Sequence, residues 1–198
     1  MSNRHVVIQD MKFAPLLWIA VLVIAAAGVY VYLDRTGADR DTAPEGALKI
    51  YSSDALGISF QYPSNYILKE RNTGNAEREA YAITLMDKDD VANIPVGGEG
   101  PTAITVDFFQ NNVDNLTPEQ WIQNTQDSNY KLSPDGVLTP TTVGRVSALA
   151  YSWDGLYRGN SIVFGHKRNI VMLSVTMMTP DDQIVTDFAG VVASIQLE

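Results

Sequence analysis

The chain has 198 residues, with 23 Asp or Glu against 14 Lys or Arg, two His and no Cys. Its share of apolar residues, 45%, suits an ordinary globular domain and excludes a wholly disordered acidic chain. The absence of Cys excludes disulfides, thiolate metal sites, iron–sulfur clusters, thiol nucleophiles and a lipid anchor on an N-terminal cysteine. The net charge of −9 argues against nonspecific binding to nucleic acid, so no nucleic-acid partner is expected.

Residues 13–33 are predicted to cross a membrane as a single helix. The segment carries no charge, and as a helix it covers about 31 Å, one hydrocarbon thickness. Trp18 lies near one end and Tyr30 and Tyr32 lie near the other, where interfacial aromatic residues are common. A buried core helix is disfavoured because no polar face interrupts the apolar run.

A cleaved signal peptide is the alternative to this anchor. Ala25 to Ala27, followed by Gly28, satisfy the small-residue cleavage rule. The apolar run nevertheless continues to Leu33, which is longer than a signal peptide needs, and we therefore favour an uncleaved anchor. Positive residues are balanced on the two sides, whereas acidic residues gather after the segment, which favours a cytoplasmic N-terminus. Both routes export the rest of the chain.

The chain accordingly divides into four predicted parts. A short cytoplasmic N-terminus covers residues 1–12, and the transmembrane anchor covers 13–33. Residues 34–46 are rich in Asp, Gly and Pro and lack bulky apolar side chains, which predicts a flexible acidic tether; an ordered loop packed on the domain is the alternative. Residues 47–198 are predicted to form one extracytoplasmic domain.

From residue 47 onward, apolar and polar residues mostly alternate, as in strands that are buried on one face. Gly, Pro, Asn and Asp separate the predicted strands, which cover 48–53, 57–62, 66–70, 79–86, 102–110, 144–153, 156–166 and 169–178. The last strand is apolar on both faces over part of its length, which predicts a place in the middle of a sheet covered by helices.

The first predicted helix begins at Pro118. Thr117 is placed as its N-cap, and Gln120 completes a capping box. Leu116 and Trp121 are spaced for a hydrophobic staple across this start.

The second predicted helix has Thr179 as its N-cap and Pro180 as its first residue. An apolar stripe at helical spacing then indicates a face packed on the core, and it consists of Ile184, Phe188, Val191, Val192 and Ile195.

Two tight turns are predicted between the last three strands. Asp154-Gly155 is a strong signal for a two-residue type I′ turn, and residues 166–169 form a second hairpin turn. The three strands then form an antiparallel meander. Together with the helices, they predict an α+β domain, an antiparallel β-sheet flanked by helices.

The two ends of this domain resemble the PsbP-like superfamily. Residues 57–66, GISFQYPSNY, are similar to a first hairpin that ends in a Phe-x-Tyr-Pro-x-x-Trp/Tyr phrase. Residues 194–197, SIQL, are similar to a short Ser-Ile-x-Leu tail that follows the last helix. The resemblance covers roughly residues 48–198. It implies an α/β/α sandwich around an antiparallel sheet, here after one N-terminal transmembrane helix.

The resemblance also implies an exported accessory or binding module. Plant and cyanobacterial members attach to the oxygen-evolving side of photosystem II, and other bacterial members are lipoproteins or membrane-anchored proteins. This chain has no Cys for lipidation and no basic patch for docking on a photosystem. The chain departs from both kinds in these respects, and the photosystem role is not expected of it; with its predicted anchor it resembles a membrane-anchored bacterial member.

No catalytic, cofactor-binding or metal-ligating residues are predicted. His166 is the single His of the exported part, and its GHKRN context indicates an exposed turn; no G-x-S-x-G motif occurs. The acidic run from Asp87 to Asp90 could bind Ca²⁺ but lacks the EF-hand spacing, so an ordinary acidic turn is favoured. The Gly-rich residues 97–101 lead into a strand rather than a helix, unlike a phosphate-binding loop.

The aromatic residues Tyr151, Trp153 and Tyr157 around the predicted hairpin are the candidate partner-binding set. Tyr and Trp bury a large area at low entropic cost, which suits a platform for a protein or a glycan. Aromatic pairing across the strands, which would only stabilise the hairpin, is the alternative.

These observations predict a membrane-anchored, extracytoplasmic, non-enzymatic binding or accessory module with a protein partner in the envelope. A small-ligand carrier or an enzyme that uses a pocket between helix and sheet is the alternative. A pilin-like subunit is disfavoured, because the apolar segment lacks the Phe-Thr-Leu-Ile-Glu-type start and its acidic residue.

The topology can be tested in isolated membranes. The full-length protein should stay in the membrane after carbonate washing, because residues 13–33 are uncharged and long enough to span it. Protease added to intact spheroplasts should digest the domain. Full-length protein in the carbonate supernatant, or a protected domain, would contradict the predicted topology.

Overall fold

The computed structural model describes residues 46–75, 78–94 and 96–198. The predicted anchor at 13–33 and residues 34–45 of the predicted tether lie outside these residues, so both stay predictions. Within the described residues, no helix has the length and apolar character that a membrane span requires.

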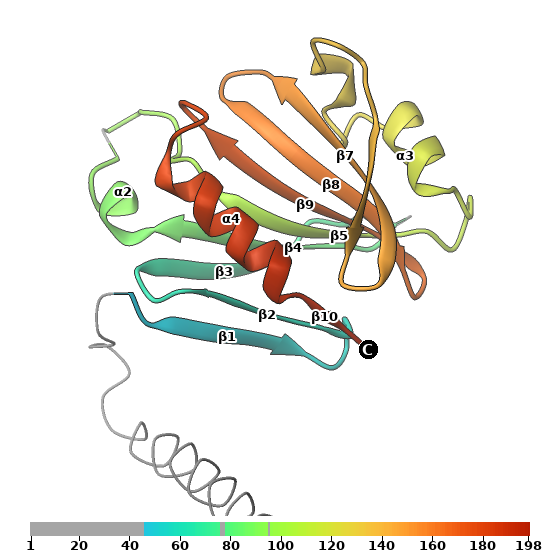
Figure 1. Cartoon of the computed structure of the whole chain (residues 1–198), viewed down its shortest axis with the longest axis horizontal. Coiled ribbons are helices and arrows are strands. Elements are labelled where there is room, and N and C mark those ends of the chain that lie inside the picture. The colour runs from blue at the N-terminus through green and yellow to red at the C-terminus, as the bar shows by residue number, and fades with distance from the viewer. Residues whose placement is uncertain (1–45, 76–77, 95) are drawn as a thin grey trace, which may run out of the picture. The chain divides into compact units, whose positions relative to one another are not determined.

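The described strands form two sheets in which all neighbours are antiparallel (Figure 1). The small sheet has the order β1-β2-β10, and the large sheet has the order β3-β4-β5-β9-β8-β7-β6. In chain order the elements are β1 (Leu48–Ser53), β2 (Ile58–Pro63), β3 (Tyr66–Asn72), β4 (Ala80–Asp87), α2 (Lys88–Ala92), β5 (Ile104–Gln110), α3 (Pro118–Asn124), the 3-10 helix η1 (Tyr130–Leu132), β6 (Thr139–Val143), β7 (Val146–Asp154), β8 (Arg158–His166), β9 (Asn169–Met177), α4 (Gln183–Ser194) and β10 (Gln196–Leu197).

Strand β9 lies at the centre of the large sheet, between β5 and β8. Alternate side chains of β9 enter a first core on one face of the sheet, and they are Val171, Leu173, Val175 and Met177. Ile170 and Met172 point to the other face and belong to a second core. The prediction that this strand lies in the middle of a sheet covered on both faces is therefore confirmed.

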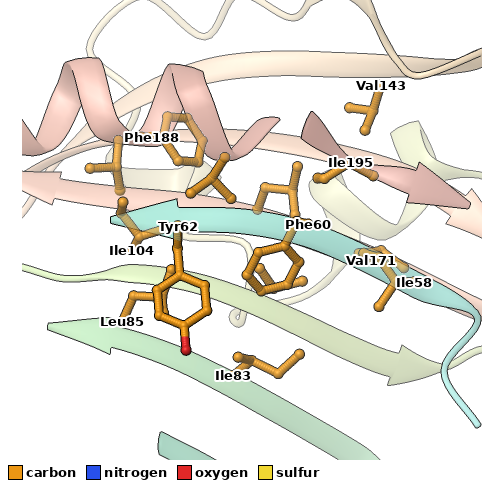
Figure 2. Close-up of a cluster of buried hydrophobic side chains, with 14 of the residues drawn as sticks. Ile58, Phe60, Tyr62, Ile83, Leu85, Ile104, Val143, Val171, Phe188 and Ile195 are labelled. Atoms are coloured by element: carbon orange, nitrogen blue, oxygen red, sulfur yellow. The ribbon is translucent and has the colours of Figure 1, made fainter. Parts of the chain in front are cut away.

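The first core lies between the large sheet, helix α4 and the small sheet. Figure 2 shows Phe60 and Tyr62 of β2 directed toward the strand that carries Ile83 and Leu85, with Phe188 of α4 in the same cluster. Every second residue of β2 is buried, because one face of this strand packs on the large sheet. The predicted apolar stripe of α4 is confirmed, since it supplies buried residues to this core and only Val192 is partly buried.

The second core packs helix α3 against the opposite face of the large sheet. Trp121 and Ile122 are the buried residues of α3, and Trp121 lies 4.7 Å from Phe109 between ring centroids. The predicted capping box is confirmed, because Thr117 Oγ1 accepts from Gln120 N and the side chain of Gln120 accepts from Thr117 N. Two helices on opposite faces of an antiparallel sheet give the predicted α+β class.

Helix α4 starts three residues later than predicted. Its N-cap is Asp182, whose carboxylate accepts hydrogen bonds from the backbone N–H groups of Met178 and Thr179, at 2.8 and 3.0 Å. The hydroxyl of Thr179 donates to the same carboxylate at 2.6 Å. The prediction of Thr179 as N-cap is wrong, because Asp182 uses Thr179 and Pro180 to form a turn before the helix begins.

Of the two predicted turns, one is confirmed and one is wrong. His166 pairs with Asn169, and Lys167 in the intervening turn has a left-handed φ of 53°. In the other hairpin Asp154 pairs with Arg158, so three residues rather than two connect the strands. Gly155 does not take the positive φ that a type I′ turn requires.

Strands β6 and β10 are edge strands of the two sheets. Strand β6, TPTTV, was not predicted, since Pro140 interrupts the strand signal; proline is tolerated there because β6 is an edge strand. Strand β10 is the short edge strand that the tail after α4 implies, and Gln196 pairs with Ser59 of β2.

In the second core, Trp153 of β7 covers a glycine on the neighbouring strand. Trp153 is paired with Gly159 of β8, and its indole N–H donates to Ser161 Oγ at 3.0 Å. A Cβ atom added at Gly159 would lie 2.2 Å from Trp153 Cζ2. The ring therefore occupies the space that any side chain at position 159 would need.

This contact predicts that Gly159→Ala destabilises the domain by roughly 1–3 kcal/mol or more, as other overpacked sites do. Gly165→Ala is the matched control on the same strand, because a Cβ atom there meets nothing within 4 Å. The control should stay within about 0.5 kcal/mol of the unmodified protein in urea unfolding followed by Trp fluorescence. Equal stabilities of the two variants would show that Trp153 does not pack as described.

Candidate functional site

The predicted aromatic set does not form a surface. Tyr151 and Trp153 share one face of β7, as expected, but their side chains are only 4% and 9% exposed and belong to the second core. The Tyr151 hydroxyl donates to the carbonyl of Ser128 at 2.5 Å, and burial raises the pKa of Tyr151 to about 12. Opposite them on β8 lie Ser161 and Gly159, so the two rings pack into the core rather than against aromatic residues across the strands.

The third member of the set lies apart from the other two. Tyr157 is half-buried in the connection between β7 and β8, and its hydroxyl donates to the carbonyl of Gly100 at 2.7 Å. The exposed apolar side chain of this hairpin is Leu156, at 73%. Partner binding by the hairpin stays a prediction, and only Leu156 and Tyr157 could supply apolar area for it.

His166 is buried, contrary to the expectation of an exposed turn histidine. It is the last residue of β8 and points to the same face as Phe164 of the first core, because strand residues alternate. Its Nε2 atom lies next to Gly57 of the β1–β2 connection, where an added Cβ atom would be 3.1 Å away. This nitrogen is buried and has no hydrogen-bond partner among the described residues. Burial lowers the pKa of His166, because the charged ring is less well solvated there.

The acidic run at residues 87–90 is a helix cap rather than an isolated turn. Asp87 Oδ1 accepts from the backbone N–H groups of Asp89 and Asp90, at 2.8 and 3.4 Å, and so starts α2. Its other oxygen, Oδ2, accepts from Asn65 Nδ2 at 2.5 Å. Within the described residues, no group of three or more His, Cys, Asp or Glu side chains is placed to hold a metal ion.

The most distinctive surface lies where β5 ends and β9 begins. We name it the basic cleft; it has a volume of about 490 Å³ and is lined by Asn111, Asn112, Asn115, Leu116, Pro118, Gly165, Lys167, Arg168, Asn169 and Ile170. These residues include two cations and four Asn but no carboxylate, in a chain with a net charge of −9. Such a lining favours an anionic ligand.

Local backbone structure holds both walls of the basic cleft. One wall is the loop after β5, in which the amide of Asn111 binds both backbone groups of Leu116, at 2.9 and 2.8 Å. The other wall is the β8–β9 turn, which is joined to the loop by a hydrogen bond from Asn111 N to the carbonyl of Arg168 at 2.9 Å. The side chains of Lys167 and Arg168 are exposed and make no ion pair within the described residues.

The nearby carboxylate of the loop is turned to another cation. Asp114 forms an ion pair with Arg78 of the β3–β4 connection, and neither residue lines the basic cleft. The negative charge of Asp114 is thereby partly neutralised outside the cleft. The positive charge of Lys167 and Arg168 is therefore not cancelled by the acid of the facing loop.

A second cleft adjoins the first and shares Arg168 and Asn169 with it. This mixed cleft has a volume of about 590 Å³ and is lined by Ser53, Ala55, Leu56, Asn72, Glu79, Ala80, Tyr81, Phe108, Gln110, Arg168 and Asn169. It lies between the β1–β2 connection and the strand ends of the large sheet, and it combines apolar, amide and charged groups. The two clefts meet at Arg168 and Asn169, and the mixed cleft includes the acidic residue Glu79, whereas the lining of the basic cleft includes no acid.

A third hollow corresponds to the alternative of a pocket between helix and sheet. It has a volume of about 410 Å³, and Phe188 of α4 lines it together with Ala150, Ser152, Asn160 and Ile162 of β7 and β8, among others. The small side chains of β7 leave this part of the sheet face open beside the helix.

Comparison with known proteins gives the fold. No protein-family model and no curated protein matches the sequence. The solution structure of cyanobacterial PsbP (CyanoP) from Synechocystis sp. PCC 6803 is similar, with a TM-score of 0.51 and 12% identity over 83% of this chain and 99% of that chain. The described domain has a PsbP-like fold.

A crystal structure from Bacteroides thetaiotaomicron VPI-5482 is also similar, with a TM-score of 0.48 and 11% identity. The match covers 76% of this chain and 48% of that chain. At 12% identity the comparison with the cyanobacterial structure concerns the fold alone, and the chemistry of the described domain follows from its own side chains.

One acidic residue of the PsbP-like domain lies on a sheet face rather than at an edge. Asp107 of β5 is aligned with Arg71 and Met172 across the sheet, on the face that also carries the second core. Burial raises its pKa to about 6, against the lowering effect of the Thr105 hydroxyl and of Arg71. Asp127 adds a smaller repulsion that also raises the pKa.

Asp107 therefore predicts a pH-dependent stability. The folded protein binds this proton more tightly than the unfolded chain, whose pKa is 3.8, so the contribution of Asp107 to stability is full below pH 4 and is lost as pH rises through 6. Asp107→Asn should be about 2–3 kcal/mol more stable than the unmodified protein at pH 8 and equal to it at pH 4. The exposed control Asp181→Asn should follow the unmodified protein in urea unfolding at both pH values. A pH-independent difference for Asp107→Asn would contradict the assignment.

Proposed function

We propose that this chain is a membrane-anchored bacterial PsbP-like protein that acts outside the cytoplasm as a non-enzymatic binding module. Its ligand, in this proposal, is an acidic segment of an envelope protein, held in the basic cleft. The observation that carries the proposal is the lining of that cleft, which has Lys167, Arg168 and four Asn and no carboxylate.

Electrostatics supports an oriented encounter with an acidic partner. The chain as a whole carries a net charge of −9, so an acidic segment is repelled by most of its surface. Screening limits this repulsion to about 8–10 Å at physiological salt, which leaves a local attraction at Lys167 and Arg168. A negative ligand would therefore be attracted locally to the basic cleft, although the chain as a whole is acidic.

The side-chain types support binding rather than catalysis. The guanidinium of Arg168 can donate two parallel hydrogen bonds to one carboxylate, and the ammonium of Lys167 adds a point charge. The exposed amides of Asn112 and Asn115 can donate to and accept from a peptide backbone. These groups bind and orient an anionic chain, and none of them is a nucleophile or a general base while the Lys is charged.

The anchoring part of the proposal is supported by the sequence. Residues 13–33 are uncharged and long enough to cross a bilayer, and residues 34–46 have the composition of a flexible tether. A tethered domain searches only a thin layer next to the membrane, which raises its effective concentration toward membrane-bound partners.

The alternative is a small-ligand carrier. The hollow beside Phe188 favours it, because it provides an open space between α4 and the sheet. If the protein is such a carrier, a substitution of Arg168 should not change ligand binding, since Arg168 does not line that hollow.

The basic cleft can be tested with a fluorescent Glu-rich peptide and the detergent-extracted full-length protein. Arg168→Glu should weaken peptide binding at least about tenfold, since a charge-assisted hydrogen bond contributes about 1.5–3 kcal/mol. Arg145→Glu is the control, because it makes the same charge change at an exposed residue outside the cleft. A matching Gln-rich peptide should bind weakly to all variants. Equal losses of peptide affinity for Arg168→Glu and Arg145→Glu would show that only net charge matters and would overturn the basic cleft as the binding site.

A further inference from the structure

We propose that strand β1 is a dimerisation edge, at which a second copy of this chain pairs antiparallel with β1 around a two-fold axis through Ile50. The two small sheets then form one continuous sheet. This inference concerns a different edge of the domain from the basic cleft and does not rest on it.

The outer edge of β1 is free. In the order β1-β2-β10 the described residues give β1 one neighbour, β2. The backbone N–H of Ser64 donates to the carbonyl of Ala47 at 2.8 Å, which marks Ala47 and every second residue after it as hydrogen-bonded to β2. The backbone groups of Leu48, Ile50 and Ser52 therefore point away from β2, toward the open edge.

The same alternate residues present apolar side chains to solvent. Leu48 is 59% exposed and Ile50 is 70% exposed. The opposite face of β1 is held on the domain, because the Tyr51 ring stacks on Phe60 at 5.0 Å between centroids and its hydroxyl donates to Glu70 at 2.6 Å. Edge strands are commonly protected by proline, bulges or several charges, and β1 has only one charge, Lys49.

The strand is complementary to itself in one register. A two-fold axis through Ile50 places Ile50 opposite Ile50 of the second copy and Leu48 opposite Ser52, and the backbone groups of all these residues are free to pair. The same register places Lys49 of the second copy opposite Tyr51, whose hydroxyl holds the Glu70 carboxylate. An axis through Lys49 would instead oppose two Lys residues whose backbone groups already bind β2.

The chain that precedes β1 allows both copies to reach one membrane. In this register Leu48 lies opposite Ser52 of the second copy, so antiparallel pairing separates the two starts of β1 by four residues along the strand, about 14 Å. The predicted tether, residues 34–46, has a root-mean-square reach of about 20 Å if it is flexible. A single strand pair gives only a weak dimer in solution. Anchoring two copies in one bilayer raises their effective concentration, and this favours the pairing of β1 with β1.

The chain has no native Cys, so one introduced Cys reports on the symmetric contact in membranes that contain the full-length protein. Ile50→Cys should give a disulfide-linked dimer under mild oxidation, because the opposed Cα atoms lie about 5.5 Å apart in this register. Gln61→Cys is the matched control. Gln61 is an exposed residue of β2 that is paired with Ile50 of β1. The Cα atoms of Gln61 in the two copies would be three strand spacings apart, about 14 Å, which is too far for a disulfide. The dimer should be several-fold more abundant for Ile50→Cys.

A second measurement keeps the test independent of disulfide chemistry. Energy transfer between labelled full-length copies in vesicles should fall for Ile50→Lys, which opposes two positive charges, and should persist for Leu156→Lys, an equally exposed apolar site elsewhere. Equal cross-linking of the two Cys variants, no cross-linking of either, or a disulfide of Ile50→Cys to a different protein would overturn the proposal. Unchanged energy transfer for Ile50→Lys would overturn it as well.

Discussion

Strand β9 has to be covered on both faces, and the arrangement of the domain follows from that requirement. Val171 and Leu173 face one core and Ile170 and Met172 face the other, so an open sheet with one exposed face would leave large apolar area in water. Helix α4 and the small sheet cover the first face, and α3 covers the second. The small sheet is thus a part of the core layer, and it brings the β1–β2 connection over the end of the large sheet.

Much of the fold could be predicted because strand and helix signals are local. The alternation in β2 and the Thr117–Gln120 capping box depend on residues close in sequence, and the structure confirms both. The start of α4 could not be predicted, because Thr179 and Asp182 are both residue types that cap helices well. Which of the two is the N-cap depends on the backbone N–H groups that the Asp182 carboxylate binds, those of Met178 and Thr179. The burial of Trp153 depends on Gly159 of the neighbouring strand, which no local pattern reveals.

The candidate site was harder to predict than the fold, because it combines two segments that are distant in sequence. Each segment has an ordinary local interpretation: Asn111 and Asn115 suit a polar loop, and Lys167 and Arg168 suit a hairpin turn. Only the pairing of β5 with β9 places the loop beside the turn. The absence of carboxylates from the cleft depends in addition on the ion pair of Asp114 with Arg78, which is again a contact between distant segments.

The two proposed surfaces are physically linked through Gly57. A Cβ atom at this position would lie 2.1 Å from Lys167 Nζ, at the end of a flexible side chain, and 3.1 Å from His166 Nε2, so the β1–β2 connection packs closely against the turn that carries the basic cleft. The positive φ of 64° at residue 57 favours glycine there. The end of the Lys167 side chain thus lies close to the β1–β2 connection. The open edge of β1 and the basic cleft are therefore joined in sequence and in space by the β1–β2 connection, whose residue 57 packs against the turn of the cleft.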